Sequence, residues 1–75
     1  MKYKIIDRQF DDRYYGGGTG VVFNSKKEIC EQLISYHSND CNMVEEQKLL
    51  DNNKINKCLE LLFDFEWELE EIIDN

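Results

Sequence analysis

The stretch "FDFEWELE", from Phe63 to Glu70, decides the fold because apolar and acidic residues alternate in it without exception. A period of two is the pattern of a strand with one buried and one solvated face. Aromatic residues at the apolar positions also favour a strand. The sequence therefore predicts a C-terminal strand whose core side chains are Phe63, Phe65, Trp67 and Leu69.

A helix is the alternative for residues 63–73. Glu is a good helix former, and apolar residues recur at helical spacing at Leu62, Phe65, Leu69 and Ile72. A helix that continued from residues 53–62 through this segment would be apolar nearly all round. The reason is that Phe63 and Trp67 would lie on a different face from Leu62 and Leu69. We favour the strand, and the helical alternative stays open at this point.

Two further strands are expected near the start of the chain. Residues alternate from Lys2 to Ile6, which indicates a strand. The turn-rich "DDRYYGGGTG" follows, and its glycines permit positive φ. The short β-branched run Val21–Phe23 then predicts the return strand of a hairpin with a long tip.

Helical signals fill the middle of the chain. Ser25 and Glu28 fit a capping box, and apolar residues recur behind it at helical spacing as far as about His37. A weaker cap at Asn42 opens a short helix to about Leu50, and a third helix is expected over residues 53–62. The predicted fold is a single α+β domain over residues 1–75. Its order is ββααβ, and its three-stranded antiparallel sheet has helices packed on one face.

Charge narrows the choice of partner. The 75 residues include 16 acidic and nine basic ones, for a net charge of -7. Direct nucleic-acid binding depends on Lys and Arg at phosphates, and an anionic membrane is disfavoured for the same reason. A protein with a basic surface is therefore the expected partner. Three cysteines without framework spacing, and no apolar run suited to a signal peptide or membrane span, indicate a cytoplasmic location.

The acids of the closing segment are the first candidate site. In a strand, alternate residues are spaced about 6.8 Å apart on one face, so these side chains would form an even row of negative charge. Such a row could mimic a nucleic-acid backbone inside a basic channel. The structural alternative is cross-strand pairing with Lys2 and Lys4, which are predicted on the same face. The row consists of Asp64, Glu66, Glu68 and Glu70, and Glu71 is a further candidate from the surplus of acid around it.

The hairpin tip is the second candidate site. Arg13, Tyr14 and Tyr15 are of types that dominate binding hot spots. With Phe10, the two tyrosines could instead form a homodimer face in a self-associating structural module. The loop Gly16–Gly20 could bind a nucleotide or another small molecule, although no Lys-Ser/Thr pair follows the glycines as a phosphate loop requires.

No catalytic, metal or cofactor site is predicted. Cys30, His37, Cys41 and Cys58 could together supply four zinc ligands, but they lack paired ligand spacing. Cys30 and Cys58 fall on apolar helix faces, where free cysteine behaves as a small hydrophobe. We therefore expect a protein that is not an enzyme.

Both ends of the chain carry a resemblance. "MKYKIIDRQ" and "FEWELEEIID" are similar to the ends of small acidic early proteins of phages and prophages of Gram-positive bacteria. Some proteins of that group inhibit host defences, anti-CRISPR proteins among them. The resemblance implies an inhibitor or modulator of a host protein in the bacterial cytoplasm. A CRISPR nuclease or another nucleic-acid-handling complex would be its target, and no functional residues are carried over.

Overall fold

The structure is a computed structural model that describes residues 1–10 and 13–73. The predictions that involve the side chains of Phe10 and Arg13 lie outside its described part. Contacts divide the chain into two compact units. We call the described part of residues 1–25 and 64–75 the sheet unit, and residues 26–63 the helical unit. The prediction of a single domain stays a prediction.

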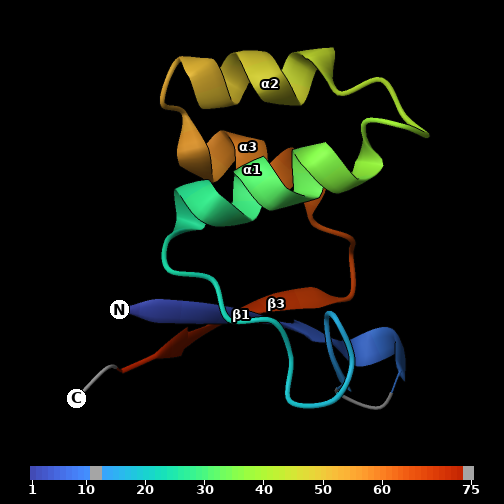
Figure 1. The fold of residues 1–75 in the computed structure, drawn as a ribbon, viewed down its shortest axis with the longest axis vertical. Helices are drawn as coiled ribbons and strands as arrows, with labels where there is room; N and C mark the ends of the chain where they lie inside the picture. Colours follow the sequence, from blue (N-terminus) through green and yellow to red (C-terminus); the bar gives the residue numbers. More distant parts are fainter. Residues whose placement is uncertain (11–12, 74–75) are drawn as a thin grey trace. The chain divides into compact units, whose positions relative to one another are not determined.

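Two antiparallel strands form the regular part of the sheet unit. Strand β1 (Lys2–Asp7) pairs with strand β3 (Trp67–Ile72), in a register that runs from Lys2 opposite Ile72 to Asp7 opposite Trp67. Figure 1 shows the two strands side by side, although nearly the whole chain separates them in sequence. The C-terminal segment is therefore a strand, and the fold class is α+β.

The predicted three-stranded sheet in the order ββααβ is wrong. The segment Val21–Phe23 forms no strand, and only Phe23 makes a single bridge, to Tyr3. On the same edge of β1, away from β3, lies β2, a stub of two residues (Arg13–Tyr14) that follows the 3-10 turn η1 (Arg8–Phe10). A run of three apolar residues is too short to indicate whether the segment forms a strand or only a single bridge.

The glycine loop explains why the pairing along this edge is interrupted. The Tyr15 N–H bonds to the Ile5 carbonyl, whereas Phe23 exchanges both bonds with Tyr3. Tyr3 and Ile5 are two positions apart along β1, but Tyr15 and Phe23 are eight positions apart, so the loop contains six extra residues. Gly20 has a φ of +87°, and a Cβ there would lie 2.5 Å from Cβ of Tyr14.

The alternating stretch is only partly a strand. Phe63 follows the last residue of helix α3, and a turn closes where the Trp67 N–H bonds to the Asp64 carbonyl. The prediction that Phe65 belongs to the core is wrong, since its side chain is 95% exposed. Phe63, Trp67 and Leu69 are half-buried. A helix and the following antiparallel strand need a connection, and residues 63–66 supply it.

Three helices make up the helical unit, and each contacts the other two. Helix α1 (Lys26–His37) begins directly after Ser25 and ends where the sequence predicted. Helix α2 (Val44–Asp51) is preceded by Asn42, whose side-chain oxygen accepts the Val44 N–H at 3.0 Å. Helix α3 (Ile55–Leu62) follows Asn53, which adopts a φ of +58° and so separates the two helices.

The apolar faces of these helices supply most of the fully buried side chains. Their spacing on α1 is the helical repeat seen in the sequence, so the predicted face is the one that is buried. The buried residues of the helical unit are Ile29, Cys30, Leu33, Ile34, Leu50, Cys58 and Leu59. None of the helices in the described residues has the length and apolar character to span a membrane.

Candidate functional site

One face of the sheet brings the predicted acids against basic residues of β1. The register places Lys4 directly opposite Glu70 and Ile6 opposite Glu68. Since side chains alternate along a strand, Lys2, Lys4 and the two glutamates share this face. The predicted cross-strand arrangement of lysines and acids is thus confirmed by the register.

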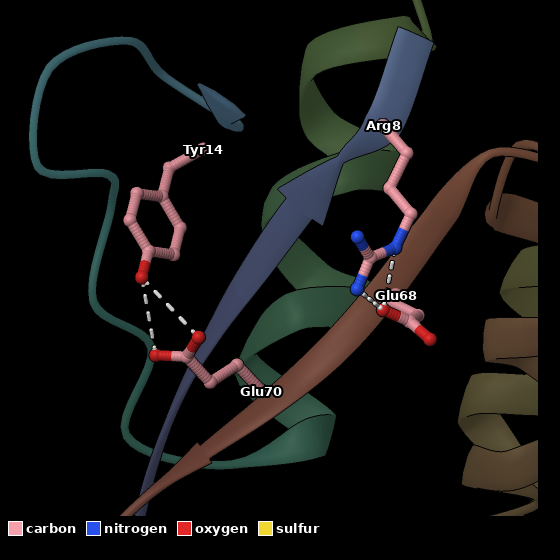
Figure 2. A network of polar contacts seen from close by, with 4 residues as sticks. All are labelled: Arg8, Tyr14, Glu68 and Glu70. Carbon is pink, nitrogen blue, oxygen red and sulfur yellow. Dashed lines mark hydrogen bonds and ion pairs between the residues drawn. The ribbon is translucent and has the colours of Figure 1, made fainter. Parts of the chain in front are cut away.

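Arg8 binds Glu68 at one end of this face. Its Nε donates to Oε2 of Glu68 at 2.8 Å, and its Nη2 donates to the same oxygen (Figure 2). Both side chains are about half exposed, at 46% and 57%. An ion pair in such contact with solvent contributes roughly 0.2–1 kcal/mol to stability. Arg8 therefore links the end of β1 to β3 without being a strong anchor.

Tyr14 binds Glu70 further along the same face. The phenol O–H lies 3.2 and 3.3 Å from the two carboxylate oxygens, and Figure 2 shows it directed between them. The ammonium of Lys4 lies 4.8 Å from the centre of the Tyr14 ring, within cation–π range. The hydrogen bond to Glu70 and then its negative charge raise the pKa of Tyr14 above its ordinary value. Tyr14 is thus held across the sheet by two partners.

The remaining candidate acids do not continue the row. Asp64 lies in the turn before β3, and Glu66 precedes the strand, where its carbonyl accepts the Arg8 N–H at 3.0 Å. Glu71 lies opposite Tyr3, on the other face of the sheet, and is exposed. The predicted even row of acids is therefore reduced to Glu68 and Glu70 within the strand.

Tyr15 lies on the opposite face from Tyr14. Its ring packs edge-on against Trp67, with centroids 5.3 Å apart, and tilts against Phe23 at 6.5 Å. Neighbouring residues in an extended segment point to opposite faces, which explains the separation of the two tyrosines. Arg13 contributes its backbone to β2, and its side chain lies outside the described part.

The glycine loop uses part of its backbone for its own turns. The N–H of Gly17 donates to the Tyr14 carbonyl at 3.0 Å, and that of Gly20 donates to the Gly17 carbonyl at 2.9 Å. A phosphate-binding loop directs successive N–H groups outward at the anion. These two donors point inward, so the positive φ angles of the loop have a structural explanation.

The helical unit brings the buried thiols of Cys30 and Cys58 together and leaves Cys41 exposed. The thiol of Cys58 donates to the Glu46 carbonyl at 3.4 Å, and burial raises its pKa. Burial and then the Cys58 thiol raise the pKa of Cys30 to about 12. Cys41 is exposed and lines a shallow groove with Met43, at the junction of α1 and α2. Within residues 1–10 and 13–73, no cluster of His, Cys, Asp and Glu is placed to hold a metal ion.

Comparison of the chain with protein-family models, curated proteins and solved structures gives no match. The sequence interpretation missed the exposed Phe65 between Asp64 and Glu66. Its exposure could have been predicted from the need for a connection between the third helix and the C-terminal strand, because residues in such a connection leave the core face of the strand.

Proposed function

We propose that the protein is a non-enzymatic binding module that occupies a basic surface on a partner protein and inhibits or modulates it. The observation that carries the proposal is the surplus of surface acid. The sequence has 16 acidic and nine basic residues, and no charged side chain is buried within the described residues. The excess negative charge therefore faces solvent, where it steers a positively charged partner.

The acids concentrate at the C-terminal segment. Residues 63–75 contain six acidic residues and no basic one. Glu68 and Glu70 are already held by Arg8 and Tyr14, so a partner binds at Oε2 of Glu68 or at Glu70 only in competition with these groups. Asp64 and Glu71 are exposed and make no side-chain hydrogen bond or ion pair within the described residues. These two acids are therefore the cleaner contacts for a basic surface.

A nucleic-acid-handling protein, such as a nuclease, is the partner class that we favour. Such proteins carry Lys and Arg along the groove that tracks a phosphate backbone. The resemblance of the chain's two ends to phage early proteins makes a bacterial host protein the first class to test. In this proposal the acidic surface takes the place of phosphates, and the chain itself binds no nucleic acid.

The test begins with capture from a Gram-positive bacterial lysate at low and high salt, followed by mass spectrometry. The affinity of the purified partner is then measured over a range of salt concentrations. The sheet-unit variant combines Asp64→Asn with Glu71→Gln. We expect it to weaken binding about fivefold, which corresponds to a loss of about 1 kcal/mol, and to flatten the salt dependence.

The matched control removes two charges from the helical unit, by Glu31→Gln with Glu60→Gln, both exposed residues. We expect the control to retain the affinity within about twofold, because its two charges are not part of the proposed contact and most residues outside a hot spot contribute little. Equal affinity and salt dependence for the natural chain and both variants would overturn the acidic-surface proposal. Failure of the chain to displace a nucleic acid from its partner would remove the mimicry alone.

A further inference from the structure

The outer edge of β3 carries backbone groups that point away from the sheet. The Arg8 N–H bonds to the Glu66 carbonyl, so these two opposite residues form a hydrogen-bonded pair. Every second pair of opposite residues along β1 and β3 is hydrogen-bonded in the same way. Glu68 and Glu70 consequently direct their backbone groups toward β1. Leu69 and Glu71 direct theirs to the opposite side.

The bonds on the far side of β1 support this assignment. Tyr3 and Ile5, which lie opposite Glu71 and Leu69, use their backbone groups on the β2 side and not toward β3. Within the described residues the strand order ends at β3, and no strand pairs with its outer edge. The N–H and C=O groups of Leu69 and Glu71 therefore form a template for one more strand.

Charge decides which strand fits the template. Glu68 and Glu70 flank the edge on one face, and Glu71 is exposed on the other. Both contacts from Arg8 converge on Oε2 of Glu68, and Figure 2 shows the second carboxylate oxygen directed away from the guanidinium. That oxygen is able to accept a bond from a basic side chain on an added strand.

A second copy of the chain does not fit the same edge. In antiparallel pairing of two β3 strands, the register centred on Leu69 sets Glu68 against Glu70 of the other copy. A shift to the next hydrogen-bonded register on either side sets Glu68 or Glu70 against its own equivalent. Like charges directly opposite each other destabilise a strand pair, so the edge acids discourage self-pairing.

We propose that the outer edge of β3 accepts an extended segment of the partner protein as an additional antiparallel strand, with Lys or Arg at alternate positions. Main-chain bonds to Leu69 and Glu71 would supply affinity, and the acids would select for basic side chains. The exposed Phe65 and Ile73 lie beyond the two ends of β3, where apolar residues of the same segment would cover them. This inference rests on the proposed function, for which it names the mode of contact.

The probe is a short capped peptide that alternates Lys with Val, and its control carries N-methyl groups on alternate residues so that it cannot pair. Amide hydrogen exchange is followed by NMR on the natural chain. At a peptide concentration ten times the Kd, about a tenth of the protein is free. The exchange of the Leu69 and Glu71 amides should therefore slow about tenfold, while the amides of Glu68 and Glu70 change less, since β1 already protects them.

Two variants at one position separate backbone pairing from charge. Glu71→Pro removes an outward N–H without removing a bond to β1, and proline is tolerated on edge strands. Glu71→Gln removes the charge but keeps the N–H. We expect Glu71→Pro to lose peptide binding and Glu71→Gln to weaken it only a few-fold. If the proline variant does not fold, the exchange measurement on the natural chain decides the question.

Three outcomes would overturn the edge proposal. The first is peptide binding that leaves the Leu69 and Glu71 amides unprotected, and it would leave the acidic-surface function standing. The second is that the lysine peptide does not bind at low salt. In that case capture from lysate would still test the acidic-surface function independently. The third is a concentration-dependent dimer that protects the same amides without peptide, which would make a second copy the occupant.

Discussion

Replacement of glycine by alanine at two positions of the glycine loop tests how tightly the loop is built against β2. Gly20 has a φ of +87°, and an added Cβ would lie 2.5 Å from Cβ and 2.8 Å from Cγ of Tyr14. Gly18 has a φ of +56°, and an added Cβ would meet nothing within 4 Å. Both positions impose positive φ on alanine, but only Gly20 adds a collision, so Gly18→Ala is a matched control.

The magnitudes follow from these two terms. A left-handed conformation costs a non-glycine residue roughly 1–2 kcal/mol, which is the whole expected effect of Gly18→Ala. The collision at Gly20 adds overpacking strain of roughly 1–3 kcal/mol, because Tyr14 is held by its pairing to β1 and by its bond to Glu70. A chain of this length has a total stability of about 4–11 kcal/mol, so Gly20→Ala removes a large part of it.

Urea or thermal unfolding followed by the fluorescence of Trp67 is the suitable assay, because this residue lies in the sheet unit against Tyr15. For a domain of this size, 1 kcal/mol corresponds to about 4–8 °C in Tm. We expect the Tm of Gly20→Ala to fall below that of Gly18→Ala by at least about 4 °C. Equal Tm values for the two variants would refute the close approach of Gly20 to Tyr14.

Four further predictions concern the thiols, an exposed aromatic side chain and the ion pair. At neutral pH a thiol reagent should label Cys41 in the native chain and reach Cys30 only after unfolding; rapid labelling of Cys30 would contradict its burial. Since the raised pKa of Cys30 favours the protonated thiol in the fold, stability should fall with rising pH between about 9 and 12 in denaturant titrations, and a flat profile would contradict this. Phe65→Ala should change the free energy of unfolding by less than about 0.5 kcal/mol, as expected for an exposed side chain, whereas a larger loss would indicate a packed ring. A double-mutant cycle of Arg8→Gln and Glu68→Gln should give a coupling energy of about 0.2–1 kcal/mol that declines with salt, and a salt-independent value would refute a solvent-exposed pair.

The helices were predictable because their signals are local. The segment from Ser25 to His37 has a capping-box motif, a regular apolar face and a polar end, all within one stretch of sequence. The turn between α2 and α3 is equally local, since the backbone N–H groups of Asn52, Asn53 and Lys54 bond to carbonyls only three to five residues before them. Neither feature depends on the rest of the chain.

The sheet was less predictable because its pairing is not local. Alternation in residues 63–70 has the same appearance in the connection as in the strand, so Phe65 could not be separated from Trp67 without knowing where β1 begins to pair. The prediction of a strand at Val21–Phe23 was wrong for a related reason. Phe23 is fully buried, but the six extra residues of the glycine loop prevent its neighbours from forming a ladder with β1.

The acids of the C-terminal segment divide into two groups that bear differently on function. A partner's arginine at Oε2 of Glu68 would have to displace Arg8, and the gain from one exposed ion pair would be offset by the loss of another. No such exchange is required at Glu71 or Asp64, or at the outward backbone of Leu69. Affinity for a basic partner should therefore depend on the acids that the fold leaves to solvent and on the strand edge between them, while Glu68 and Glu70 chiefly maintain the sheet that presents this edge.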